Sequence, residues 1–213
     1  MKYLSNYKLM EVLNGFRIST AHWDNALSNG HLVYLIGNDD SHDVSDITDI
    51  ATRFTMINAD ENEAEKILSS LENGNAVGVD FPIIYDETLE QKIKRLKKNL
   101  PHITQVELKD DTLLVSASKP ISKIRFIGQE GKELKTQKNI KTGTYVIQPE
   151  DNYVRCELKF KDGTTLYLNP ITRHENNEIT KQRLDHINYP KTIILWTVYL
   201  SIISFAAYRI IKR

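Results

Sequence analysis

The sequence has few of the features that mark disulfide-bonded or nucleic-acid-binding proteins. Its 213 residues include a single cysteine, Cys156, which excludes an internal disulfide framework and a cysteine-rich zinc module. Neither sign of charge is in excess, because 28 Lys and Arg residues balance 28 Asp and Glu residues. A chain without a net positive field has little to attract a polyanion, and we therefore expect no nucleic-acid partner.

The amino-terminal segment lacks the apolar run of a secretory signal, which takes roughly 7 to 15 residues. No run of that length occurs in the opening MKYLSNYKLMEVLNG. Two expectations follow. Either the chain is anchored by its tail, or a signal peptide lies upstream of this sequence and the soluble part is extracytoplasmic, in the periplasm.

The carboxyl end carries the one long apolar run. Residues 192–208 have no charged side chain, and as a helix rising about 1.5 Å per residue they would reach about 25 Å, close to the hydrocarbon thickness of a bilayer. Lys191 and Arg209 flank the run, and long basic side chains extend such a helix to the interface. We predict a single transmembrane helix and basic tail over residues 191–213, with membrane lipid as its partner. A buried core helix is the alternative, and basic residues on both sides leave the orientation open.

The first third of the sequence alternates short apolar runs with helical patterns. Apolar runs at residues 9–13, 32–36 and 54–57 have the length of strands. A helical pattern ending at Gly30 separates the first two runs, and another, capped by Asp60 and ending at Gly74, follows the third. This β-α-β-α-β order predicts an α/β fold with a parallel sheet covered by helices on both faces.

The segment that most suggests chemistry follows the second of these apolar runs. Residues 37–43, Gly-Asn-Asp-Asp-Ser-His-Asp, place three carboxylates and an imidazole after a buried strand, where α/β folds build their sites. Asp40 and His42 are two residues apart. In an extended segment such side chains point the same way, so they could share a divalent metal ion.

Other interpretations of this segment stay open on the residues alone. Two ligands fall short of the three protein ligands usual at a catalytic zinc. One alternative is an acidic turn in which Asp40 or Ser41 caps the following segment. Calcium binding by the acidic cluster is a third interpretation, although the spacing does not fit an EF-hand loop.

Three motifs in this region occur in a fixed order: Glu11-Val12-Leu13-Asn14, then His22-Trp23-Asp24-Asn25-Ala26-Leu27-Ser28-Asn29-Gly30, then Ile36-Gly37-Asn38-Asp39-Asp40-Ser41-His42. Together they resemble the last part of the PHP superfamily of metallohydrolases, the polymerase and histidinol phosphatase type. The similarity continues through residues 55–78. It implies a distorted β/α barrel and metal-dependent hydrolysis of phosphoesters or related bonds.

The resemblance also implies roles for individual residues. Asp40 and His42 match the last pair of metal ligands, in a site for divalent ions such as zinc, manganese or iron that acts on a small phosphoester substrate. Asp39, Glu11 and Asn14 would be neighbours of that site rather than ligands.

The ligands that PHP enzymes take from earlier strands are missing from this sequence. Such enzymes begin with a His-x-His motif, whereas no two of the six histidines here stand two residues apart. A barrel with so few strands would leave unpaired edges. We therefore expect an incomplete PHP-type barrel that is not a competent enzyme alone and whose open edges could acquire a partner chain.

The pattern changes in the second half of the chain. Residues 88–99 predict a linking helix with a strongly basic, solvated face, which includes Lys92, and Pro101 marks the change to strands. Six or seven short alternating segments follow, separated by turn signals such as Lys119-Pro120. They predict an all-β, antiparallel sandwich of immunoglobulin type.

The β-rich half also carries part of the resemblance. Tyr153-Val154-Arg155 and Asn169-Pro170-Ile171 look like the closing strands of the β-sandwich that follows the PHP barrel in some membrane-associated or secreted members. No metal cluster or nucleophile triad is found in this half. Tyr145, Tyr153 and Tyr167 could form a binding surface, but packing is the commoner role of such residues.

The predicted organisation has five parts: a PHP-like portion over 1–86, a linking helix over 87–100, a β-sandwich over 101–175, a linker over 176–190 and the membrane helix over 191–213. Two functions compete. The chain is either the carboxyl-terminal portion of a membrane-anchored PHP phosphoesterase or a non-catalytic binding or spacer module on a membrane stalk.

Overall fold

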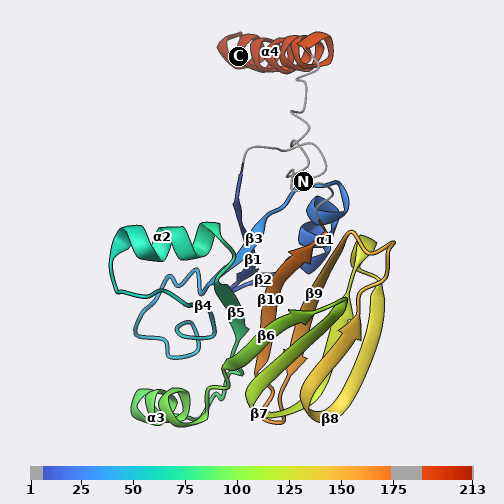
Figure 1. Cartoon of the computed structure of the whole chain (residues 1–213). Helices are drawn as coiled ribbons and strands as arrows, with labels where there is room; N and C mark the ends of the chain where they lie inside the picture. The colour runs from blue at the N-terminus through green and yellow to red at the C-terminus, as the bar shows by residue number, and fades with distance from the viewer. Residues whose placement is uncertain (1–6, 174–188, 213) are drawn as a thin grey trace. The chain divides into compact units, whose positions relative to one another are not determined.

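The computed structural model describes residues 7–173 and 189–212. The chain divides into two units, Met1–Gln182 and Arg183–Arg213. The first unit is a mixed α/β structure with two sheets, and the second contains one long helix (Figure 1). Most of the predicted linker over 176–190 lies outside the described residues.

The smaller sheet has three strands in the order β2-β1-β3. β1 (Leu9–Asn14) and β3 (Tyr34–Asn38) run parallel, as their apolar runs predicted, while β2 (Arg17–Ile18) is antiparallel to β1. Helix α1 (Thr20–Ser28) connects β2 to β3. It buries Trp23 completely against the sheet, in a core shared with Val12, Leu13 and Leu35.

The prediction of one parallel sheet is wrong for its third strand. β4 (Arg53–Ile57) pairs antiparallel with β5 (Ala76–Asp80), and both belong to the larger sheet. An apolar run indicates that a strand is buried but not which neighbour it pairs with. The intervening helix α2 (Ala64–Glu72) contacts β3 and β4 but has no buried residue, so it packs on the sheets only loosely.

The larger sheet has seven strands in the order β4-β5-β10-β9-β7-β6, with β8 also paired to β7. Its pairing of β5 with β10 joins the first part of the chain to the last strand of the unit. Hydrogen bonds of one sheet therefore cross the boundary predicted at residue 86. The remaining strands are β6 (Ile103–Lys109), β7 (Thr112–Ile127), β8 (Glu133–Val146), β9 (Tyr153–Lys159) and β10 (Thr165–Thr172).

The long hairpin of β7 and β8 gives this sheet its curl (Figure 1). β7 continues without interruption through Pro120, so the turn predicted there is wrong. The register of β7 with β8 shifts between Ser116 and Ile121. Proline is tolerated at such an irregularity because no ladder hydrogen bond needs its missing N–H. The other edge of β7 pairs with β6 at its start and with β9 at its end.

The result is a curled half-barrel sheet with its own core. Side chains from opposite ends of the curl meet there, including Val115 from the start of β7 and Leu158 and Leu166 from β9 and β10, all fully buried. Two separate sheets, as in an immunoglobulin-type sandwich, are not confirmed. The tyrosines at 145, 153 and 167 are buried, which confirms packing as their role.

Helix α3 (Leu89–Asn99) begins with a capping box in which Thr88 and Gln91 exchange hydrogen bonds. The prediction of a uniformly solvated basic face is wrong for Lys92, which is 2% exposed. Its ammonium group donates to the carbonyl oxygens of Ile47 and Ile50. Burial lowers the pKa of Lys92 below its ordinary value, and the two carbonyl acceptors compensate for lost water.

The second unit contains helix α4 (Tyr189–Ile211). Its stretch Tyr189–Arg209 is long and apolar enough to span a membrane, by length and composition. None of that stretch is buried, which disfavours the alternative of a core helix.

Candidate functional site

The carboxyl ends of β1 and β3 bring four polar side chains together. Because the two strands are parallel, with Asn14 opposite Asn38, they end at the same edge of the sheet. The Asn14 amide donates to Glu11 Oε1 and to Asp40 Oδ2, both at 3.1 Å. The Asn38 amide donates to Glu11 Oε1 at 2.6 Å. We call Glu11, Asn14, Asn38 and Asp40 the strand-end cluster.

The chain turns sharply where the strand-end cluster lies. The Asp40 N–H donates to the Asn38 side-chain oxygen at 2.9 Å, and Asp40 has a positive φ of 49°, a conformation that Asp tolerates better than most residues. Asp40 is exposed to solvent. Three of the predicted site residues, Glu11, Asn14 and Asp40, are thus brought together, and Asn38 joins them although the sequence did not single it out.

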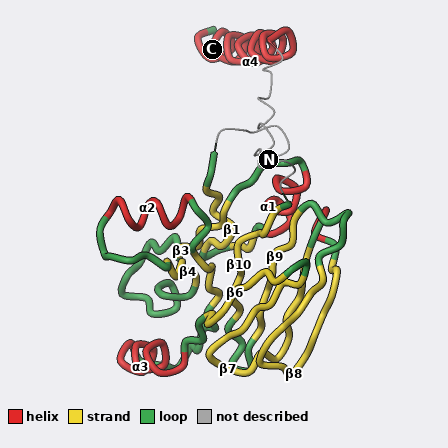
Figure 2. The backbone as a smooth tube through the Cα atoms, viewed as in Figure 1, coloured by secondary structure: helices red, strands yellow, loops and turns green. Residues whose placement is uncertain are grey.

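His42 is held by its backbone rather than by the strand-end cluster. Its N–H donates to Asp49 Oδ2 at 2.8 Å, and its ring lies 5.9 Å from the ring of Phe16. The hydrogen bonds from His42 and Asp43 hold the pKa of Asp49 below its usual value. The imidazole is exposed, on the loop between β3 and β4, which contains neither helix nor strand (Figure 2).

Asp39 organises this loop. Its carboxylate accepts hydrogen bonds from the N–H groups of Ala51, Thr52 and Arg53 and from the Thr52 hydroxyl, at 2.5 to 2.8 Å. Asp39 therefore lies beside the predicted metal ligands because its carboxylate holds the end of the loop and the start of β4 in place. The loop returns to β3 at Asp39, and Lys92 of α3 holds it from a second side.

Close backbone packing supports the same corner. A Cβ atom at Gly15 would lie 1.9 Å from the Asp39 carbonyl oxygen, so only glycine fits there. The Arg53 guanidinium donates to the carbonyl oxygens of Asn14 and Gly15 and pairs with Asp80 at 3.1 Å. Arg53 thereby ties the end of β1 to β4 and β5.

The described residues 7–173 and 189–212 contain no group of three or more His, Cys, Asp or Glu side chains placed to hold a metal ion. In the strand-end cluster, the amide groups of Asn14 and Asn38 already occupy oxygens of Glu11 and Asp40. A complete catalytic metal site usually takes three protein ligands. The described part of the chain therefore does not supply a full ligand set.

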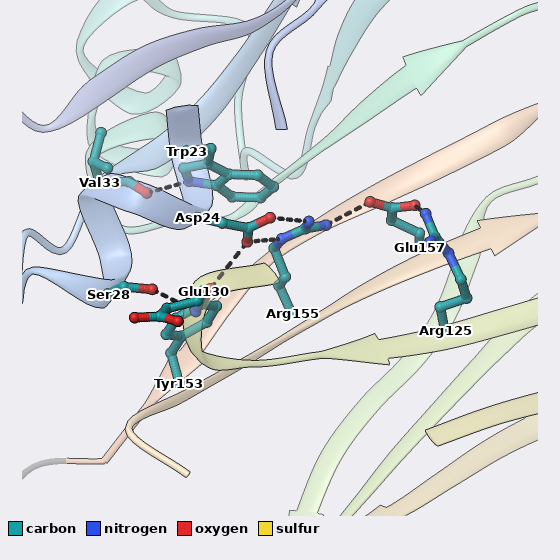
Figure 3. Close-up of polar contacts among 9 residues, drawn as sticks. All are labelled: Trp23, Asp24, Ser28, Val33, Arg125, Glu130, Tyr153, Arg155 and Glu157. Atoms are coloured by element: carbon teal, nitrogen blue, oxygen red, sulfur yellow. Dashed lines mark hydrogen bonds and ion pairs between the residues drawn. The ribbon is translucent and has the colours of Figure 1, made fainter. Parts of the chain in front are cut away.

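A second polar grouping joins α1 to β9 (Figure 3), and within it Asp24, Arg155 and Glu157 are buried while Arg125 is partly exposed. Arg155 donates to both oxygens of Asp24 at 2.7 Å and to Glu157 Oε1 at 2.6 Å, and Arg125 pairs with the other oxygen of Glu157. We call Asp24, Arg125, Arg155 and Glu157 the buried ion-pair network. The Tyr153 hydroxyl donates to Asp24 Oδ1 at 3.0 Å.

Burial and ion pairing have opposite effects on the pKa of Arg155. Burial alone would lower the pKa of Arg155, but the hydrogen bonds and charge of Asp24, with those of Glu157, raise it above its ordinary value. Burial raises the pKa of Tyr153 to about 12. An open pocket of about 580 Å³ borders the network. Because the Asp24 and Arg155 charges satisfy each other there, we assign the network a structural role.

Several residues of the motifs quoted from the sequence have structural roles between the two sheets. Trp23 donates its indole N–H to the Val33 carbonyl oxygen at 2.9 Å, under the Arg155 guanidinium. Asn169 accepts from the Leu35 N–H at 2.8 Å and donates to two carbonyl oxygens at the start of β5. The Trp-Asp motif, Arg155 and Asn169 therefore connect the two sheets.

No family model and no curated protein matches the chain. Among solved structures, it is similar to that of a two-domain protein from Bacteroides vulgatus ATCC 8482 that contains a predicted PHP-like metal-dependent phosphoesterase. The sequence identity is 15% and the TM-score 0.28, over 76% of this chain and 52% of that one. The chain thus spans about half the length of that protein. A similarity of this size supports no conclusion about function. Function must therefore be inferred from the contacts of the chain's own residues.

Proposed function

We propose that the chain is the carboxyl-terminal portion of a membrane-anchored, PHP-type metal-dependent phosphoesterase. The observation that carries the proposal is the parallel pairing of β1 and β3, which ends in the strand-end cluster. Polar side chains at the carboxyl ends of parallel strands are where α/β enzymes bind their substrates. Asp40, a member of this cluster, and His42, two residues further on, are exposed, so both remain accessible to an ion.

In this proposal the metal site takes its ligands from this chain and from a second segment. Asp40 and His42 contribute a carboxylate oxygen and an imidazole nitrogen, which suit zinc, manganese or iron. The other ligands come from residues beyond those described, on an upstream segment or a partner chain, which could pair with β2 at the open edge of the small sheet. By itself the chain is then inactive toward a small phosphoester. No catalytic step is assigned to it.

The membrane part of the proposal is supported by α4, with lipid as its partner. A helix of its length anchors a protein firmly, unlike a single lipid chain. If a signal peptide precedes this sequence, the first unit is periplasmic. A His-x-His motif in the same reading frame upstream of Met1 would support the phosphoesterase origin directly.

Manganese titration tests the metal site. The whole chain in detergent micelles is titrated with Mn²⁺, and free ion is followed by electron paramagnetic resonance. We expect one weak site that is lost in Asp40→Asn and in His42→Ala, because each variant removes one of two ligands. Asp60→Asn, an exposed carboxylate on another loop, serves as the control and should bind as the original chain does. Absence of a site, or a site indifferent to both variants, would overturn the assignment.

A second candidate function is a non-catalytic binding or spacer module on a membrane helix. The absence of a group of three metal-binding side chains in residues 7–173 favours it. In that case a chelator leaves the thermal unfolding of the chain unchanged, and added Mn²⁺ does not stabilise it. A metal-dependent increase in melting temperature would argue for the phosphoesterase origin, since a ligand that binds only the native state stabilises it.

A further inference from the structure

One segment of the first unit exposes several large apolar side chains close together in sequence. They lie on the loop before α3 and on the first half of that helix. We call them the 83–93 patch: Ile83 (43% exposed), Ile84 (46%), Tyr85 (79%), Leu89 (46%) and Ile93 (42%). Clusters of exposed apolar residues on a soluble unit mark an interaction surface more often than scattered single ones.

Other side chains of α3 contact the rest of the unit and hold the 83–93 patch in place. Leu96 and Leu100 continue the apolar stripe of α3 but pack on the core of the curled sheet. Lys92 fastens the helix to two carbonyl oxygens of the β3–β4 loop. Arg95 donates to the Pro82 carbonyl oxygen and to Glu87, so it fastens the preceding loop. The exposed apolar residues are therefore on a fixed support and need little ordering on binding.

Exposed lysines follow the patch along helix α3. Lys94, Lys97 and Lys98 are exposed, while Lys92 and Arg95 are engaged with the protein. Two exposed acids, Asp86 and Glu90, lie in the same segment, so its free charge is positive by one. Apolar side chains beside a helical row of lysines form the pattern of an interfacial amphipathic helix.

We propose that the 83–93 patch is a lipid-docking surface that recognises the anionic headgroup region of a bilayer. The isoleucines, the leucine and Tyr85 enter the boundary between headgroups and acyl chains, and the lysines face lipid phosphates and carboxylates. Charge complementarity decides for anionic lipid over an apolar protein partner, because each Lys near an anionic surface favours binding by about fivefold. The proposal is independent of the metal site. Helix α4, where it spans the membrane, only raises the local concentration of lipid.

A fluorophore at position 85 tests this directly on the whole chain. Tyr85→Cys is labelled with the environment-sensitive dye NBD; the native Cys156 is 2% exposed and stays unlabelled. The chain is reconstituted into vesicles of phosphatidylcholine alone or of equal parts phosphatidylcholine and phosphatidylserine. We expect a blue shift and a brighter emission only with phosphatidylserine, and its reversal by salt.

Two controls separate docking from general proximity to lipid. Lys94→Glu, Lys97→Glu and Lys98→Glu together should lower the docked-to-free ratio by at least about 100-fold. The same charge change at Lys132, Lys138 and Lys141, exposed on or beside β8, should leave it unchanged. A dye at Val44→Cys, which is 81% exposed on another loop, should not respond to lipid.

Three results would overturn the lipid-docking surface. The dye at position 85 stays in water with phosphatidylserine; the blue shift survives the triple reversal at 94, 97 and 98; or the dye at Val44 responds equally. Flotation of the chain with neutral vesicles reports insertion of α4 separately, so a failure of anchoring is distinguishable from a failure of docking.

Discussion

The two polar groupings of the first unit differ in burial and in how many partners each charge has. Asp24 is 5% exposed and receives three hydrogen bonds from Tyr153 and Arg155. Asp40 is exposed and receives one side-chain hydrogen bond, from Asn14. A buried charge must be fully paired, whereas an exposed one can leave oxygens free for a ligand. The residues of the quoted motifs therefore fall into two groups: structural residues such as Asp24, and candidate metal ligands such as Asp40.

Breaking the buried ion-pair network should have the largest effect. Arg155→Met leaves the Asp24 carboxylate without its main partner and removes one of the two arginines that pair with Glu157, and the free energy of unfolding should fall by about 3 to 5 kcal/mol. Chemical denaturation of the chain in detergent, followed by near-ultraviolet circular dichroism, measures this.

Lys8→Met provides the matched control, because the Lys8–Glu72 pair is exposed and its loss should change stability by no more than about 1 kcal/mol. Combining Asp24→Leu with Arg155→Met should restore part of the loss, since no unpaired charge remains at position 24. An Arg155→Met variant as stable as the Lys8→Met control would contradict the structural role of the network.

Adjacent aspartates offer a sharper comparison. Asp39→Asn removes acceptors from a carboxylate that takes four hydrogen bonds, and we expect a loss of about 1 to 3 kcal/mol. Asp40→Asn should change stability by less than about 0.5 kcal/mol, as exposed substitutions generally do. Urea unfolding of the two variants gives the comparison. Equal losses would mean that Asp40 is also a structural residue.

Alkaline titration probes the burial of Tyr153. The folded pKa is about 12, above the ordinary 10.0, so the folded state holds the phenolic proton more tightly than the unfolded chain. This contribution to stability is complete below pH 10 and is lost as the pH rises toward 12. Ultraviolet difference absorbance counts the tyrosines that ionise late. Tyr153→Phe should remove one of them, and an unchanged number would place the ring in solvent.

The smallest effect is expected at Cys156. Burial raises the pKa of its thiol, so the thiolate that reacts with disulfide reagents is scarce, and the side chain is also inaccessible. An aromatic disulfide reagent should release no chromophore at neutral pH until denaturant unfolds β9. Rapid labelling of the native chain would show that β9 opens readily in the folded protein.

Sequence patterns identified the strands and helices better than their pairing. The apolar runs at β1 and β3 and the pattern before Gly30 predicted the first β-α-β segment correctly. β4, by contrast, was assigned to a parallel sheet but is antiparallel to β5, because an apolar run has the same appearance in either direction. Pro120 was taken as a turn, and it instead lies within β7 at a register shift.

For the candidate site, the resemblance to the PHP superfamily implied that Glu11 and Asn14 lie beside Asp40, and the structure brings the three side chains within hydrogen-bonding distance. Metal binding by Asp40 and His42 stays a prediction. Asn38 was given no role although it lies within the quoted segment 37–43, since an amide has no distinctive signal beside carboxylates. The role of Arg53 and the burial of Lys92 were missed because both residues bind backbone carbonyl oxygens, which no side-chain pattern reveals, and because Asp80, the ion-pair partner of Arg53, lies 27 positions away.

By itself, the sequence determined which segments are apolar enough for strands, for helix α1 and for the helix α4 that could span a membrane. These properties depend on composition and periodicity within a few consecutive residues. Only the tertiary structure decided that β5 joins β10, and that Asp24 meets Arg155 across 131 positions of the chain. Such contacts form because burial of the two sheets' cores brings distant segments together, and a buried charge must then find its partner there.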